Sequence, residues 1–362
     1  MGRKVFALTN KKDTLNNLLV PVLSVVFGFI LGAIIMVIFG YNPIAGYTAM
    51  INGAFGSSFY IGETLRQATP LILTALGFSV AYNAGFFNIG VAGQALVGWL
   101  CSVWVANSFI DLPSIILLPL SILGGILAGA IWAGIAGFLR AYFNTSEVIV
   151  TIMLNYTALY TTNYLIRNVL TESADATPRI SEGASLRAGW ITELTSNSTL
   201  HTGIFISLAM AVIVWFLMKK TTTGFEIRTV GLNPSASEYA GMSTKRNIII
   251  SMLISGGLAG LGGVMEGLGN FQNIFTQGAM PTIGFDGMAV ALLGLSNPVG
   301  IIFSAILFGA LKIGGNSMPM ISGVPTEVVD IVIASIIFFV GANYLIRYFI
   351  DKRARVNKGG VK

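Results

Sequence analysis

The sequence is dominated by long apolar runs that contain no charged residue. The first of them, residues 18–39, has 22 residues, and a helix of that length spans about 33 Å. Such a helix crosses the hydrocarbon core of a bilayer, which is roughly 30 Å thick. Since lipid offers no partners to backbone polar groups, such runs fold as helices. The sequence therefore predicts an all-α chain that crosses a membrane several times.

The composition agrees with a chain that lies mostly in lipid. Only 10% of the 362 residues are charged, whereas soluble domains carry roughly 25%. The 43 glycines suit helices that pack closely in a membrane. The first apolar run is longer than the core of a cleaved signal peptide, so it is interpreted as a retained helix. About ten crossings are predicted, at residues 18–39, 61–82, 86–107, 114–139, 146–166, 202–218, 247–268, 281–296, 298–316 and 326–349.

Several functions are excluded by what the chain lacks. Cys101 and His201 are the only residues of their kinds, so neither a disulfide framework nor a Cys or His zinc site is expected. The net charge of +6 follows from the loops of a membrane protein and does not indicate a nucleic-acid partner. No cofactor and no metal are predicted.

Basic residues in the loops set the predicted orientation. Lys and Arg outnumber Asp and Glu by four to one in residues 1–17, by five to two in 219–246 and by six to one in 347–362. The 167–200 loop has three basic and four acidic residues. The positive-inside rule therefore places both termini and 219–246 in the cytoplasm and 167–200 outside. The predicted organisation is a cytoplasmic tail (1–17), a single transmembrane domain (18–349) and a basic cytoplasmic tail (350–362).

Two pairs of similar segments indicate an internal repeat. The string Asn-Tyr-Leu-Ile-Arg at 163–167 recurs at 343–347, and 89–93 resembles 283–287. Chance similarity between apolar helices is the alternative, although a shared five-residue string favours duplication. In the predicted topology the repeats are inverted. Inverted repeats are common in transporters, whose substrate path lies near helices that break within the membrane.

Two predicted helices are interrupted by polar residues and glycines. Residues 83–94 carry three amides and three glycines, and glycine weakens a helix. Amides in lipid need partners, so they either face a polar cavity or join neighbouring helices. The second interruption, 282–287, contains an acid that is costly at membrane depth. Six residues are interpreted as lining a substrate path: Asn83, Asn88, Gln94, Asn270, Gln272 and Asp286. Lys312 is expected to snorkel to the outer surface.

The glycine-rich run at 256–263 is interpreted as a packing surface. It lacks the Lys-Ser/Thr ending of a phosphate-binding loop and lies inside an apolar span. The serines and the single histidine form no recognisable catalytic arrangement. The chain is therefore not predicted to be an enzyme, and any ATP would be hydrolysed by another chain.

The 219–246 loop contains a predicted short helix. Asn233 followed by Pro234 suits an N-cap and a first helical position, and Gly241 suits a left-handed end. The helix at 235–240 would be about two turns long. A capped helix isolated between two spans has little to pack against, so docking to a cytoplasmic partner is favoured over an ordinary solvated turn. The candidate docking residues are Arg228, Asn233, Pro234, Glu238, Tyr239 and Gly241.

These motifs resemble those of membrane permease subunits of ATP-binding-cassette (ABC) importers. The similar branch serves branched-chain amino acids, simple sugars and nucleosides. The resemblance covers about residues 18–350 and is carried by 87–94, 231–241 and 284–294. The pattern Asn-Ile-Gly-x-x-Gly-Gln is most similar to that of bacterial nucleoside uptake permeases, although these often have Glu where this chain has Ala92.

The resemblance implies an assembly in a bacterial inner or plasma membrane. Its other members would be a cytoplasmic ABC ATPase, a second and non-identical permease subunit, and an extracellular substrate-binding lipoprotein. The ATPase coupling loop would correspond to residues 224–246, and the substrate would be a nucleoside. Ribose-like sugars or branched-chain amino acids are alternative substrates. An ion-coupled secondary transporter, with Asp286 and Glu266 handling protons or sodium, is a further alternative, whereas the intramembrane polar residues disfavour a scaffold without a substrate.

Overall fold

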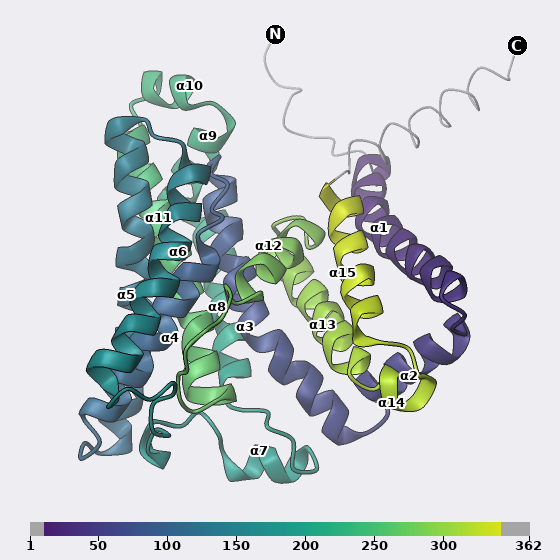
Figure 1. The fold of residues 1–362 in the computed structure, drawn as a ribbon. Coiled ribbons are helices and arrows are strands. Elements are labelled where there is room, and N and C mark those ends of the chain that lie inside the picture. The colour runs from purple at the N-terminus through teal and green to yellow at the C-terminus, as the bar shows by residue number, and fades with distance from the viewer. Residues whose placement is uncertain (1–10, 342–362) are drawn as a thin grey trace, which may run out of the picture. The chain divides into compact units, whose positions relative to one another are not determined.

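A computed structural model describes residues 11–341 of the chain (Figure 1). Within this range the chain is helical and has no β-strand, apart from one isolated antiparallel bridge between Ala176 and Phe275. The predicted all-α, multi-pass class is confirmed. The predicted C-terminal tail, the second copy of the repeated string and most of the N-terminal tail lie outside the described residues. Five described segments are long and apolar enough to cross a membrane: Pro21–Ile38, Ser114–Phe143, Gly203–Lys220, Thr244–Asn270 and Pro298–Gly315.

The chain divides into two compact units, of which the first contains residues up to 53 and from 314 onward. In this unit α1 packs along α15, with Gly28 against Ile336 and Gly32 against Val332. Small residues allow such close approach of two helices in lipid. Sequence reasoning missed the second helix, α2. The helices of this unit are α1 (Lys11–Ile38), α2 (Pro43–Phe55), α14 (Met318–Ser322) and α15 (Thr326–Gly341).

Residues 54–313 form the second unit. Two π-helices, η1 (Ile166–Leu170) and η3 (Met265–Asn270), continue α6 and α11, and a 3₁₀ turn, η2 (Glu182–Ala184), lies in the 167–200 loop. The α-helices of this unit are α3 (Ser58–Asn83), α4 (Val91–Ser108), α5 (Ser114–Phe143), α6 (Glu147–Leu165), α7 (Gly189–Leu194), α8 (Gly203–Lys220), α9 (Thr222–Leu232), α10 (Pro234–Tyr239), α11 (Thr244–Val264), α12 (Ile283–Leu293) and α13 (Pro298–Gly315).

Glycines hold α11 against α5 and α4 in this unit. A Cβ atom on Gly260 would lie 2.5 Å from the carbonyl oxygen of Gly125 and 3.1 Å from the Cα of Gly129, both in α5. Gly263 lies even closer to the carbonyl oxygen of Ala95 in α4. No side chain larger than hydrogen fits at these crossings. The prediction that the 256–263 run is a packing surface is confirmed.

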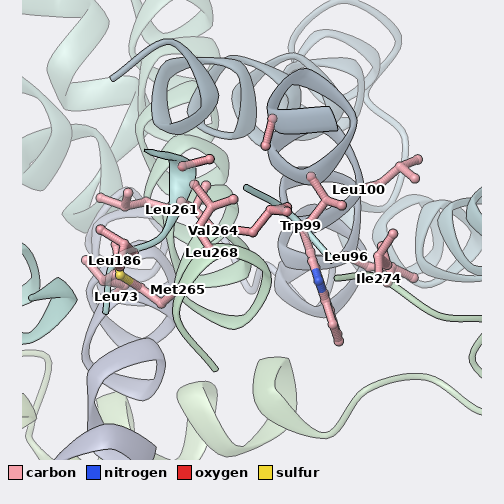
Figure 2. Close-up of a cluster of buried hydrophobic side chains, with 14 of the residues drawn as sticks. Leu73, Leu96, Trp99, Leu100, Leu186, Leu261, Val264, Met265, Leu268 and Ile274 are labelled. Atoms are coloured by element: carbon pink, nitrogen blue, oxygen red, sulfur yellow. The ribbon is translucent and has the colours of Figure 1, made fainter. Parts of the chain in front are cut away.

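Apolar side chains of α3, α4, α11 and η3 form a buried cluster beside these crossings (Figure 2). The cluster also receives Leu186 and Ile274, which come from loops outside the helices. Burying one such side chain instead of leaving it in water stabilises a fold by roughly 1.5–3 kcal/mol. The two loops are therefore fixed onto the helices. The indole of Trp99 extends away from the aliphatic side chains of the cluster.

The structure departs from the predicted crossings at 281–296. There α12 has 11 residues and is about 16 Å long, which is roughly half the hydrocarbon thickness. It does not cross by itself. The predicted span 281–296 counted Leu295 and Ser296 as helix, whereas they lie in a turn after α12 and both have positive φ, at 56° and 53°. The interruption predicted at 83–94 is present, since α3 ends at Asn83 and α4 begins only at Val91.

Candidate functional site

The two predicted interruptions meet inside the second unit. Gly284, at the start of α12, lies so close to Ala92, at the start of α4, that a Cβ on the glycine would collide with the backbone of Ala92. Thr74 of α3 adjoins the same point, because its hydroxyl donates a hydrogen bond of 3.5 Å to the carbonyl oxygen of Ile283. The first turns of α4 and α12 are therefore in contact with each other.

The helices that begin at this contact run in opposite directions. α12 runs parallel to α3, since Ser79 near the end of α3 donates to the carbonyl oxygen of Ser296 just beyond α12, at 3.0 Å. α4 runs antiparallel to α3. The start of α3 and the end of α4 both contact the 167–200 loop, through bonds of Glu63 with Thr199 and of Asn107 with Pro178. If 89–93 and 283–287 are inverted repeats, the helices that follow them must run in opposite directions, as α4 and α12 do.

Asn88 and Gln94 form a reciprocal amide pair in the first interruption. The Nδ2 of Asn88 donates to Oε1 of Gln94 at 3.0 Å, and the Nε2 of Gln94 donates to Oδ1 of Asn88 at 3.1 Å. Asn88 also donates to the hydroxyl of Ser255 in α11 at 2.9 Å. Both side chains are buried. For this pair, the geometry favours amides that join helices over amides that face an open cavity.

Asn155 of α6 completes the contacts of this interruption, and sequence reasoning missed it. Its Oδ1 accepts a bond of 2.8 Å from the backbone N–H of Gly93, and its Nδ2 donates to the carbonyl oxygen of Ile89 at 2.9 Å. The first N–H groups of a helix have no partner within the helix. Asn155 supplies one for α4. An amide in the middle of an apolar span was the only signal in the sequence.

Two further amide candidates have hydrogen-bond partners outside the first interruption. Asn83, the last residue of α3, donates to the carbonyl oxygen of Ser79 at 2.7 Å. Gln272 donates to the hydroxyl of Ser185 in the 167–200 loop at 2.7 Å. Each is partly exposed. The structure therefore does not bring the six predicted path residues together into one cluster.

Asp286 forms an ion pair with Lys312 of α13. Lys312 also donates to the hydroxyl of Thr282 at 3.2 Å. A carboxylate at membrane depth needs such a partner, and its position in the first turn of α12 suits the helix dipole. For Lys312 the structure thus shows an ion pair in addition to the snorkelling that its place in the sequence allowed. Its ammonium group neutralises Asp286 within the second unit.

Asn270 belongs to a buried polar cluster beneath the 167–200 loop. Its Nδ2 donates to Glu266 at 2.8 Å, and its Oδ1 lies 3.2 Å from Nε2 of His201. Arg187 of the loop donates to the carbonyl oxygens of Gly269 and Asn270, at 3.0 and 2.5 Å. These bonds give partners to the last two carbonyl oxygens of η3 and hold the 167–200 loop against it. Residues 11–341 contain no group of three His, Cys, Asp or Glu side chains that could hold a metal ion.

His201 predicts a dependence of stability on pH. Its Nδ1 accepts from the backbone N–H of Gly203, so its Nε2 carries the proton given to Asn270. Burial lowers the pKa of His201 from 6.5 to about 4. Between these values the unfolded chain binds the extra proton, so stability falls as the pH falls from 6.5 towards 4. We expect the thermal midpoint of the purified protein to drop by a few degrees across this window.

The control for this prediction is His201→Gln, which keeps an amide partner for Asn270 but does not titrate. Melting curves of the variant should be flatter between pH 6.5 and 4 than those of the wild type. Equal slopes for the two proteins would show that His201 does not cause the dependence.

The 219–246 loop forms two helices, α9 and α10. The Oδ1 of Asn233 accepts from the N–H of Ala236 at 3.0 Å, Pro234 occupies the first turn of α10, and Gly241 has φ +83°. The predicted capped helix is therefore confirmed, although it spans 234–239 instead of 235–240. Sequence reasoning missed α9, which carries Arg228.

The tips of these helices expose large side chains. Tyr239 is 95% exposed and Leu232 is 87% exposed, and Glu238 is also exposed. Leu232 and Tyr239 thus stand at the last residues of α9 and α10 with almost no contact to the rest of the chain. Leu232 was not predicted, because in the sequence it reads as one more apolar residue.

The loop also contacts the first helix interruption directly. A Cβ on Gly231, in α9, would lie 2.9 Å from the carbonyl carbon of Ala84 and even closer to the carbonyl oxygen of Asn83. Gly85, with φ +84°, lies on the other side of the same contact. The contact joins two backbones without intervening side chains. The end of α9 and the turn that precedes α4 are therefore in direct backbone contact.

The fold and these contacts define a multi-pass, all-α membrane protein with interrupted helices and an exposed helical loop. The family model for the branched-chain amino acid transport system / permease component matches residues 60–341, and the chain belongs to this family. It is therefore a permease component of a transport system and not an enzyme.

Three curated relatives resemble the chain over most of its length. The guanosine ABC transporter permease protein NupP of Bacillus subtilis is 52% identical, over 93% of this chain and 97% of the relative. The nucleoside ABC transporter permease protein NupB of Lactococcus lactis is 50% identical, over 92% and 93%. A second Bacillus subtilis guanosine permease protein, NupQ, is 29% identical, over 74% and 86%. No solved structure matches the chain.

Proposed function

We propose that the chain is a permease subunit of an ABC importer that carries nucleosides across a bacterial cell membrane. The observation that carries this proposal is the extent of the similarity. Two relatives described as guanosine or nucleoside ABC permeases are at least 50% identical over more than nine tenths of the chain. A nucleoside is neutral and rich in hydrogen-bonding groups, which suits a protein whose buried polar side chains are mostly uncharged.

The proposed partners are those of an ABC importer. The sequence carries no phosphate-binding loop, so a separate cytoplasmic ATPase would supply the energy. The exposed Leu232 and Tyr239 would dock to it. Bacillus subtilis has two different guanosine permease proteins similar to this chain, which supports a non-identical second permease subunit. An extracellular substrate-binding lipoprotein would deliver the nucleoside to the face that carries the 167–200 loop.

The proposed mechanism links the docking surface to the helix interruptions. ATP binding would close the ATPase and move α10 and α9. The contact of Gly231 with Asn83 and Ala84 passes that movement to the turn at 84–90. The bonds of Asn88, Gln94 and Asn155 would then be rearranged, and the paired starts of α4 and α12 would shift against each other. The substrate would enter from outside and leave inside.

Uptake measurements test this proposal. Labelled guanosine and other nucleosides, ribose and leucine would be offered to cells with and without the gene, and to cells whose partner ATPase is inactivated by substitution. We expect loss of nucleoside uptake in both mutant strains, with ribose and leucine uptake unchanged.

Each other outcome would overturn a specific part of the proposal. Loss of ribose or leucine uptake in place of nucleoside uptake would change the substrate but keep the importer. Uptake that requires the gene but not the ATPase, and that an ionophore abolishes, would indicate an ion-coupled transporter.

A further inference from the structure

An aromatic cluster lies where α11 and η3 end and the chain turns back towards α12. Trp99 of α4, Phe271 and Phe275 form it, with ring centroids 5.2, 5.5 and 5.3 Å apart. Phe271 stacks on the indole at an interplanar angle of 15°, and Phe275 meets both rings edge to face. The proposed mechanism makes no use of this cluster.

Hydrogen bonds and burial fix the residues on which the ring of Phe271 rests. Trp99 is buried, and its Nε1 donates to the carbonyl oxygen of Asn273 at 2.8 Å. Arg187 holds the backbone just before Phe271 through the carbonyls of Gly269 and Asn270. The ring of Phe271 therefore rests on a fixed surface.

One face of Phe271 is free. Trp99 stacks on one face of the Phe271 ring, and Phe275 meets the ring edge to face. The residue is 46% exposed. The side-chain amide of Asn273, whose backbone adjoins the indole, makes no hydrogen bond within residues 11–341. An exposed aromatic ring and an amide without a hydrogen-bond partner in this range are thus two residues apart in the chain.

Phe271 belongs to an irregular segment whose backbone could line a water-filled cavity. Residues 271–282 have no helix or strand, and Gly278 and Thr282 are exposed. Irregular backbone at membrane depth is tolerated only where protein buries it or where it lines a water-filled cavity. This chain leaves Phe271 46% exposed, so a water-filled cavity is the setting assigned to its ring, in contrast to exposed rings on regular membrane helices.

We propose that the free face of Phe271 is a stacking site for the base of an incoming nucleoside. This inference rests on the proposed function and names a binding site for it. Every nucleobase has a flat π-face, and stacking on an aromatic side chain contributes ~1–3 kcal/mol per base. Phe271 follows the end of α11 opposite to the 219–246 loop, so the base would stack there on the outer side. The site would bind purine nucleosides more tightly than pyrimidine nucleosides, because the larger ring system stacks over more area.

The test is nucleoside binding to the importer complex in nanodiscs, without the delivering lipoprotein, with labelled guanosine as the probe. Phe271→Leu keeps an apolar side chain on Trp99 but removes the ring, and it should raise the Kd about tenfold, which corresponds to ~1.4 kcal/mol. Phe271→Tyr should bind nearly as well as the wild type.

The matched control is Phe205→Leu. Phe205 is 55% exposed and also stacks on a tryptophan, Trp190, but it lies on the regular helix α8. Its replacement should leave the Kd unchanged.

Three outcomes would overturn the inference. Equal guanosine affinity of Phe271→Leu and wild type would remove the site and leave the proposed function intact, provided that uptake in cells depends on the gene. An equal loss of affinity in Phe205→Leu and Phe271→Leu would show a general effect of removing exposed rings. Absence of both binding and gene-dependent nucleoside uptake for the wild type would overturn the function together with the site.

Discussion

Replacing Gly260 with Ala is expected to reduce the stability of the second unit by about 3 kcal/mol, the upper part of the usual range for overpacking. The added methyl group would lie 2.5 Å from the carbonyl oxygen of Gly125 and 3.1 Å from the Cα of Gly129. Both are backbone atoms, which cannot rotate away as a side chain would. The amount of folded protein extracted from membranes should fall severalfold, and the remainder should melt at a lower temperature.

Gly257→Ala is the matched control for this prediction. Gly257 lies on the same helix, and a Cβ there would meet Ile126 at 3.4 Å, an ordinary contact with a side chain. The substitution gives the same gain in helix propensity without the clash. Yield and melting temperature should therefore stay near those of the wild type. Equal losses in both variants would show that the helix tolerates no added volume anywhere, and the specific role of the Gly260 crossing would be refuted.

Replacing Tyr239 or Leu232 with Asp is expected to reduce ATP-driven uptake more than tenfold without loss of folded protein. Both side chains are almost fully exposed, so the substitution changes stability little. A carboxylate placed in an apolar docking surface must be desolvated without a partner, which is strongly unfavourable. The ATPase should therefore no longer copurify with the permease. The measurements are uptake, protein amount and copurification.

Leu194→Asp provides the comparison for the docking variants. Leu194 is also a large apolar residue, 75% exposed, but it lies on α7 in the 167–200 loop. Copurification of the ATPase should be unaffected by this change. If Tyr239→Asp and Leu232→Asp kept both uptake and copurification, the docking role of the 219–246 loop would be refuted.

Features that depend on neighbouring residues in the sequence were predictable. Apolar runs located most of the membrane helices, because their length must match the bilayer. Asn233, Pro234 and Gly241 located α10, because capping is decided within a few residues. The glycines of 256–263 indicated close packing because no other role suits them in an apolar span.

Features that depend on distant partners were not predictable. The pairing of Asp286 with Lys312 joins two helices whose relative rotation no apolar pattern reports. The same holds for Asn155, which binds the backbone at the start of α4, and for Asn270 with His201. The end of α12 was placed three residues too late, although Gly294 follows the helix directly, because Leu295 and Ser296 take a left-handed conformation that their residue types do not indicate. The contact between α9 and the first interruption likewise joins segments far apart in the chain.

The ion pair of Asp286 and Lys312 has a consequence for energetics in a living cell. A single elementary charge that crosses a membrane potential of 100 mV gains or loses about 2.3 kcal/mol. Because α12 and α13 carry opposite charges that remain together, a joint movement of the two helices displaces no net charge. If the solute is neutral as well, the voltage across the membrane neither drives nor opposes this step. Transport by such a pair of helices would run at the same rate in polarised and depolarised cells.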